Sequence, residues 1–234
     1  MDRGTKKGLI ILLSVVVVLM TMLGLDAWWK RQNKFVYEQH LDDVVLTVND
    51  SSLTLREFGI YIYEVETKVD EQARIYNPED PMDYWNTYFS SGVEGGYISQ
   101  MSRDVALESC VCDMIYEDMA RDAGYELTEE EMKEAAKNGE QVWSTMSEAQ
   151  VRITGITKDL AVKVYQRKRL VQKFAADYYE NVDFTGYCGY REELVSYAGE
   201  YYLDNILPKN EVTYNRTIVN DLQLGRITTG YEVE

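Results

Sequence analysis

The sequence predicts a mainly α-helical fold, and three observations support that prediction. Apolar residues recur at every third or fourth position through several long segments, which is the spacing of amphipathic helices. Two of these segments begin with a capping box, in which a threonine and a glutamate three residues later satisfy backbone N–H groups at the start of the helix. Only two short runs, residues 44–48 and 226–233, have the pattern of strands.

After residue 43, the first half of the chain is expected to hold a strand, two long helices and an aromatic loop. The predicted elements are a strand at residues 44–48, a helix at 55–76, a loop rich in Trp, Tyr and Gly at 78–96, and a helix at 97–123. Thr54 and Glu57 form the first capping box, and Gly124 is the expected cap at the end of the second helix. The apolar residues of that helix cover more than one stripe, so we expect it to be central.

The second half is expected to be helical up to a closing strand. The predicted elements are helices at residues 129–149, 158–179, 190–203 and 211–222, a turn at 153–157, and a strand at 226–233. Thr128 and Glu131 form the second capping box, and Thr157 caps the helix that follows the turn. Glycines at residues 186–189 mark the break before the third helix.

Charge is divided unequally along the chain. Residues 1–34 carry six basic and two acidic side chains, whereas residues 35–234 carry 18 basic and 38 acidic ones. The net charge of −16 is therefore the sum of +4 on the N-terminal segment and −20 on the rest. Because such an acidic body repels phosphate backbones, we do not expect a nucleic-acid partner.

The N-terminal segment has the pattern of a membrane anchor. Residues 8–25 contain no charged side chain, and with the following residues in the headgroup region the run is long enough to cross a bilayer. Trp28 and Trp29 are typical of a membrane interface. A cleaved signal peptide is the alternative, but its apolar region is shorter and small residues precede the cut, whereas Leu25 and Asp26 precede Ala27 here.

We therefore expect a cytoplasmic tail and transmembrane anchor at residues 1–31, a linker at 32–43, and a helical domain at 44–234. The tail is short and basic, so it is expected to stay inside while the acidic domain is exported. The predicted location is the cell membrane, with a single span, a cytoplasmic N-terminus and an extracytoplasmic domain.

Few residues are suited to catalysis or to metal binding. Cys110 and Cys112 lie in a predicted helix, where their side chains project roughly 200° apart, so they are poorly placed to bridge or to chelate together. Burial as small apolar residues is the favoured interpretation of the cysteines, although Cys188 lies in a glycine-rich loop. His40, the only histidine, is expected to be solvated in the linker. We predict no catalytic residue, metal or cofactor.

Two features leave a functional interpretation open. The helix at 158–179 is rich in basic residues, which either pair with the acidic helix at 129–149 or form a cationic surface for a partner. Its basic residues are Lys158, Lys163, Arg167, Lys168, Arg169 and Lys173. The chain also has 19 tyrosines, which either complete a helical core with the hydroxyl at the surface or line an amphipathic cradle for unfolded polypeptide.

Three passages resemble the N-terminal domain of SurA/PrsA-type extracytoplasmic chaperones. Residues 44–58 are similar to its opening strand and first helix, although Asp50 stands where glycine is usual. Residues 123–131 resemble a later passage, in which a glycine, an aliphatic residue and a threonine precede acidic residues. Residues 155–160 resemble a further passage, in which a glycine, an aliphatic residue and a threonine begin the next helix. The resemblance covers residues 44–179, with a continuation to residue 234.

The resemblance implies a helical domain whose first strand meets a C-terminal segment, for which residues 226–233 are the candidate. It also implies a parvulin prolyl-isomerase domain, which generally uses a pair of histidines, but only 55 residues follow Tyr179 and none is histidine. We therefore expect a membrane-anchored chaperone that holds unfolded exported polypeptides without isomerase chemistry. The alternatives are an envelope scaffold that docks one protein and, third, an isomerase with an unrecognised site.

The candidate polypeptide-binding residues are aromatic residues of the 78–97 region and residues of the basic helix. They are Tyr84, Trp85, Tyr88, Tyr97, Lys163, Arg167, Lys168 and Tyr178.

Overall fold

The computed structural model describes residues 16, 20–22, 35–91 and 94–230, and the chain divides into two units, residues 1–36 and 37–234. In the first unit, residues 20–22 are helical. Most of the expected anchor at 1–31 lies outside the described residues. Within those residues, no helix combines the length and the apolar character needed to cross a membrane.

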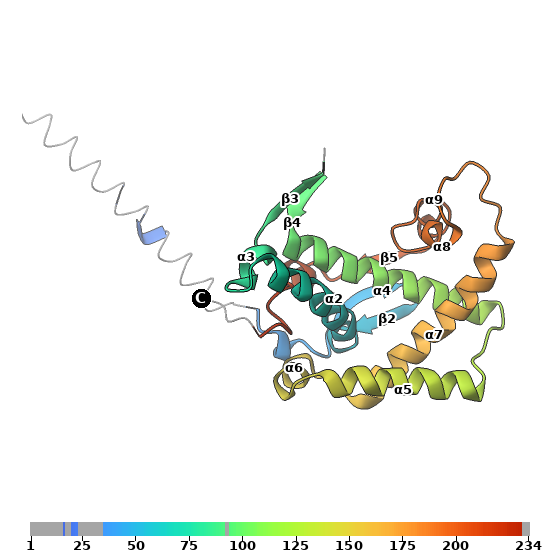
Figure 1. The fold of residues 1–234 in the computed structure, drawn as a ribbon, viewed down its shortest axis with the longest axis horizontal. Coiled ribbons are helices and arrows are strands. Elements are labelled where there is room, and N and C mark those ends of the chain that lie inside the picture. Colours follow the sequence, from blue (N-terminus) through green and yellow to red (C-terminus); the bar gives the residue numbers. More distant parts are fainter. Residues whose placement is uncertain (1–15, 17–19, 23–34, 92–93, 231–234) are drawn as a thin grey trace, which may run out of the picture. The chain divides into compact units, whose positions relative to one another are not determined.

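The second unit, here called the body, is mainly helical, as predicted (Figure 1). Its elements are η1 (Tyr37–Gln39), β1 (Val44–Val48), β2 (Ser51–Thr54), α2 (Leu55–Tyr76), α3 (Pro81–Trp85), β3 (Tyr88–Ser91), β4 (Glu94–Tyr97), α4 (Ile98–Asp122), α5 (Glu129–Thr145), α6 (Glu148–Thr154), α7 (Lys158–Asn181), α8 (Arg191–Leu194), α9 (Glu200–Asn205), η2 (Leu207–Lys209), β5 (Val212–Tyr214) and α10 (Arg216–Asp221).

Local signals in the sequence set the starts of the long helices. Both predicted capping boxes are present: the Glu57 carboxylate accepts the Thr54 N–H at 3.1 Å, and the Glu131 carboxylate accepts the Thr128 N–H at 2.8 Å. The side chain of Thr157 likewise caps the first turn of α7. These bonds satisfy N–H groups that have no partner inside the helix, so they determine where each helix begins.

The core lies between α2, α4 and α7, and α4 is its central helix, as predicted. α4 contacts α2, α3, α7, β1 and β4. Its buried residues include Ala106, Val111 and Ile115. α5 packs along α7, and Gly139 permits their close approach, because a Cβ at this position would lie 2.8 Å from the backbone of α7.

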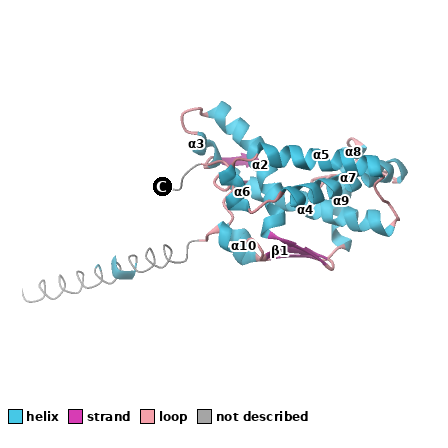
Figure 2. Ribbon diagram, turned by 90° about the horizontal axis from the view of Figure 1, so that it is seen from below, coloured by secondary structure: helices cyan, strands magenta, loops and turns pink. Residues whose placement is uncertain are grey.

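A small antiparallel sheet joins distant parts of the body in the order β2-β1-β5. Figure 2 shows β1 alongside the helices, with α10 nearby. β1 does pair with a C-terminal segment, but that segment is β5. Of the strand expected at 226–233, residues 231–233 lie outside the described residues, and none of the described residues 226–230 is in a strand. Residues 224–225 form a turn and residues 226–229 form bends, and the predicted helix at 211–222 is a strand followed by the short α10.

The last described residues form a buried segment that we call the C-terminal latch, residues 222–230. The carboxylate of Glu66, on α2, accepts five hydrogen bonds of 2.5–3.2 Å from the backbone N–H groups of residues 225–228 and from the Thr228 hydroxyl. Gln150 donates to the Thr228 carbonyl at 2.6 Å. These bonds occupy the backbone groups that a closing strand would need, which explains why no strand forms there.

Three other expected elements are divided in the structure. The predicted helix at 129–149 ends at Thr145, and Ser147 caps a separate helix, α6, which extends into the expected turn. The predicted helix at 190–203 is interrupted between α8 and α9, where Gly199 lies against the backbone of Leu194. The expected loop at 78–96 contains α3 and a hairpin made by β3 and β4.

Candidate functional site

The β3–β4 hairpin extends from the helices between α3 and the beginning of α4 (Figure 1). Tyr88 pairs with Tyr97 across the two strands, and their rings meet edge to face with centroids 5.4 Å apart. The next pair is Phe89 opposite Gly96, which lies on the other face because side chains alternate along a strand. Both faces of the hairpin therefore carry aromatic rings.

These rings are exposed. The exposed fractions are 58% for Tyr88, 51% for Phe89, 47% for Tyr97 and 40% for Met101, which follows on α4. Met101 lies against the Gly96 side of the hairpin, since a Cβ on Gly96 would be 3.3 Å from its Cγ. We call Tyr88, Phe89, Tyr97 and Met101 the hairpin surface. Two predicted binding residues, Tyr88 and Tyr97, belong to it.

Trp85 lies at the base of the hairpin and is fully buried, so the prediction that it is an exposed binding residue is wrong. Its ring packs against Gly225 of the C-terminal latch, where a Cβ would lie 2.4 Å from the indole. The aromatic composition of residues 78–97 predicted a surface, but a segment far away in the sequence covers this ring. Its role is packing between α3 and the latch.

Tyr84 lies next to the end of α2 and is half-buried. Its ring centroid is 5.3 Å from that of Tyr76, which is exposed together with Ile75. These three residues therefore add apolar surface near α3, separate from the rings of the hairpin itself.

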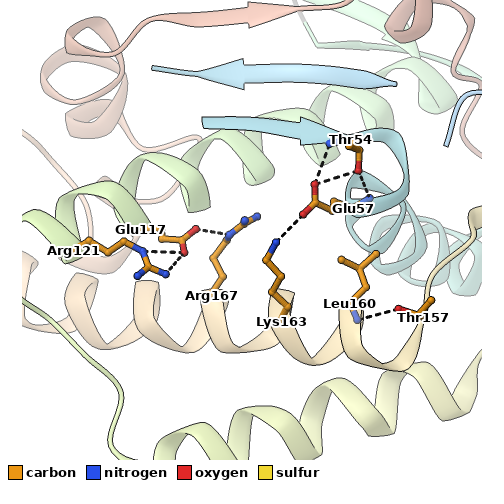
Figure 3. A network of polar contacts seen from close by, with 8 residues as sticks. All are labelled: Thr54, Glu57, Glu117, Arg121, Thr157, Leu160, Lys163 and Arg167. Carbon is orange, nitrogen blue, oxygen red and sulfur yellow. Dashed lines mark hydrogen bonds and ion pairs between the residues drawn. The ribbon is translucent and has the colours of Figure 1, made fainter. Parts of the chain in front are cut away.

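The basic residues predicted as a binding surface are paired within the body, and Figure 3 shows the pairs of Lys163 and Arg167. Lys163 contacts the Glu57 carboxylate at 3.1 Å, Arg167 contacts Glu117 at 2.5 Å, and Lys168 contacts Glu64. Their partners lie on α2 and α4, and not on the acidic helix that the sequence suggested. Lys158, Arg169 and Lys173 do pair with α5, through Glu140 and Glu131.

Because each of these cations has a carboxylate partner, the face of α7 does not carry the free positive charge that the surface hypothesis required. Tyr178 is half-buried in this region, where its ring contacts Tyr116 and Phe174. Burial, with a hydrogen bond to Tyr201, raises the pKa of Tyr178 to about 12. The eight predicted residues thus do not form one site.

A cleft of about 540 Å³ opens between α2, α4, α7 and α8. Its walls include Val65, Val105, Val171 and Val195. This volume is within the range of pockets that take small ligands or single side chains.

Several polar groups of this cleft are bonded to one another. The Tyr61 hydroxyl donates to Asp113 at 2.9 Å, and the Lys168 ammonium lies 4.5 Å from the centre of the Tyr61 ring while it contacts Glu64. Burial raises the pKa of Asp113 and, together with the Asp113 carboxylate, that of the Tyr61 hydroxyl. The cleft can receive an apolar side chain, and Glu64, Asp113 and Lys168 are already engaged.

The cysteines and the histidine do not form a reactive cluster within the described residues. Cys110 and Cys112 are buried, as expected, and burial raises the pKa of both thiols. Cys188 is exposed, contrary to the favoured interpretation. His40 lies 2.7 Å from Asp43. No group of three potential metal ligands occurs in the described part of the chain.

Sequence reasoning missed Phe89 and Met101 of the hairpin surface, and it missed Glu66. A signal for the hairpin was present: the aromatic pair at residues 88–89 and the tyrosine at 97 flank a serine- and glycine-rich stretch, which is a strand–turn–strand pattern. No local signal distinguishes Glu66 from the other glutamates of the same helix, because its partners lie about 160 residues away.

Comparisons of this chain with protein-family models, with curated proteins and with solved structures found no match.

Proposed function

We propose that this protein binds extended segments of unfolded, exported polypeptides and that the hairpin surface makes the first contact. In this proposal the body lies outside the cell membrane and residues 8–25 anchor it there. The observation that carries the proposal is the exposure of three aromatic rings on a projecting hairpin, with an exposed methionine beside them on α4. Exposed apolar residues that gather in one place mark interaction sites more often than scattered ones do.

The chemistry of this surface suits a partner that varies in sequence. Tyrosine presents a large ring with a polar hydroxyl, and methionine adapts its shape to different neighbours, so neither demands one particular residue. Both faces of the hairpin are aromatic, which allows a bound segment to contact either. A binding surface of this kind favours brief holding over selection of a single ligand.

The test uses the full chain reconstituted in lipid nanodiscs and urea-unfolded lysozyme as the client. The wild-type chain is expected to suppress aggregation of the diluted client at near-equal molar ratios. The variant Tyr88→Ser, Phe89→Ser, Tyr97→Ser should lose most of this effect, while its free energy of unfolding changes by about 1 kcal/mol or less, since these rings are exposed.

Tyr190→Ser is the matched control, because Tyr190 is 75% exposed and lies far from the hairpin in sequence, at the start of α8. It should leave suppression of aggregation unchanged. Equal loss in both variants, or no suppression by the wild-type chain, would contradict the proposal. A photocrosslinking residue at position 89 gives a further check: many adducts in membranes support it, whereas one dominant adduct would indicate docking to a single partner.

A further inference from the structure

We infer that the outer edge of β3 binds its client by strand addition, and that the favoured client segment combines basic with apolar residues. This inference rests on the proposed function and specifies how the same surface would hold polypeptide. Main-chain hydrogen bonds at the edge would provide affinity for many sequences, while the aromatic rings would contact alternate side chains.

The register of the hairpin identifies which backbone groups are available. The Ile98 N–H donates to the Thr87 carbonyl at 3.1 Å, so these opposed residues form a hydrogen-bonded pair. Hydrogen-bonded and non-hydrogen-bonded pairs alternate in an antiparallel ladder. The pairs Tyr88–Tyr97 and Ser90–Gly95 are therefore non-hydrogen-bonded, and their N–H and C=O groups point outwards from the hairpin.

The β3 edge offers more of these groups than the β4 edge does. Both Tyr88 and Ser90 present an outward N–H and C=O on β3, and no described residue takes them up. On β4, Tyr97 is the N-terminal cap of α4, so its carbonyl accepts the first bond of that helix. Only Gly95 then keeps both groups on the β4 edge. An incoming strand can therefore form more main-chain hydrogen bonds along β3 than along β4.

The charge around the hairpin favours a basic client. Residues 75–102 contain four acidic residues and neither lysine, arginine nor histidine. Glu79, Asp80 and Asp83 are exposed near the base of the hairpin. The rest of the body adds to this field, because residues 35–234 carry 38 acidic and only 18 basic side chains. An acidic surface attracts basic segments and repels acidic ones, most strongly at low salt.

Ser90→Pro tests the edge directly. Proline at this position removes an outward N–H and places its ring on the outer edge, while the inward hydrogen bonds of the hairpin are kept, as edge prolines allow. The control Ser90→Ala keeps the N–H. The probe is a fluorescent 12-residue peptide of alternating lysine and valine or phenylalanine, with its lysines replaced by glutamate in a second peptide.

Full chains in nanodiscs should bind the basic peptide about tenfold more weakly with Ser90→Pro than with Ser90→Ala, since the substitution removes hydrogen bonds of the added strand and blocks its approach. The glutamate peptide should bind wild type more weakly than the lysine peptide does. Equal affinities of the two variants would overturn strand addition, and equal affinities for the two peptides would overturn the preference for basic segments.

Hydrogen exchange of the wild-type chain gives a readout that does not depend on the folding of a variant. Addition of the basic peptide should slow exchange of the Tyr88 and Ser90 amides and leave the Gly95 amide on the opposite edge unchanged. Protection at Gly95 alone, or at none of the three despite binding, would overturn the inference. If the wild-type chain neither binds the peptide nor suppresses aggregation, the proposed function itself fails, which is a distinct result.

Discussion

The C-terminal latch and the β3–β4 hairpin are both short additions to the helical core, but they use their polar groups in opposite ways. In the latch, four backbone N–H groups and one hydroxyl converge on the Glu66 carboxylate, and Leu224, Ile227 and Thr228 are buried. In the hairpin, the outward groups of Tyr88 and Ser90 face away from the second strand and the aromatic rings are exposed.

The two segments meet at Trp85, which connects them physically. This side chain closes the base of α3, just before the hairpin, and packs on Gly225 of the latch. Burial and the hydrogen bonds to Glu66 make the latch part of the fold, because an unmade buried bond costs free energy. The hairpin, as an isolated pair of strands, contributes little to stability on its own. The comparison predicts that substitutions in the latch affect folding, whereas those in the hairpin affect binding.

The largest effect is expected from Glu66→Ala. This change leaves five buried donors of the latch without an acceptor, so we expect the free energy of unfolding to fall by about 4 kcal/mol. Urea denaturation of the full chain measures this loss. Trypsin should also cleave after Arg226 under conditions in which the wild-type latch is protected.

Glu71→Ala is the control for this prediction, since Glu71 lies on the same helix and is exposed. Its effect should be within about 0.5 kcal/mol. If Glu66→Ala were as mild as the control, the latch would not be a structural element, and the contrast with the hairpin would be lost.

An intermediate effect is expected from Gly225→Ala. Gly225 has a φ of +90°, and a Cβ there would lie 2.4 Å from the ring of Trp85. Gly230 has a similar φ of +80° with no atom within 4 Å of the same position. Both substitutions impose left-handed backbone strain, but only the first adds overlap with the indole, so we expect Gly225→Ala to cost about 2 kcal/mol more. Equal losses in urea denaturation would show that contact with Trp85 does not position the latch.

The long helices could be predicted closely from the sequence, because their signals are local. The predicted helix at 55–76 coincides with α2, and the one at 97–123 differs from α4 by one residue at each end. A capping box or a glycine acts within one turn of the residue that carries it. Such interactions depend little on the remainder of the chain, so the residues alone are sufficient to locate them.

The latch and most of the candidate site depend on partners that are distant in the sequence. Residues 226–230 have the composition of a strand, yet Glu66 accepts the N–H groups of residues 226–228. Trp85 and the cations of α7 were predicted to be exposed or available, but Gly225, Glu57 and Glu117 cover or neutralise them. The hairpin is a different case: its strand–turn–strand pattern is local, but the prediction treated residues 78–96 as a loop.

The smallest effect is expected from the pH dependence of the latch. Burial raises the pKa of Glu66 above its usual value, although the Thr228 and backbone donors oppose this rise. The folded protein therefore binds a proton at Glu66 more tightly than the unfolded chain does, so protonation favours the fold. This contribution is complete below the ordinary pKa of glutamate and is lost as the pH rises through the raised value.

The difference in free energy of unfolding between wild type and Glu66→Gln, which cannot titrate at this position, should fall across that window and stay constant above it. A difference that does not change with pH would mean that the five donors cancel the effect of burial. The latch would then stabilise the ionised carboxylate as well as water does.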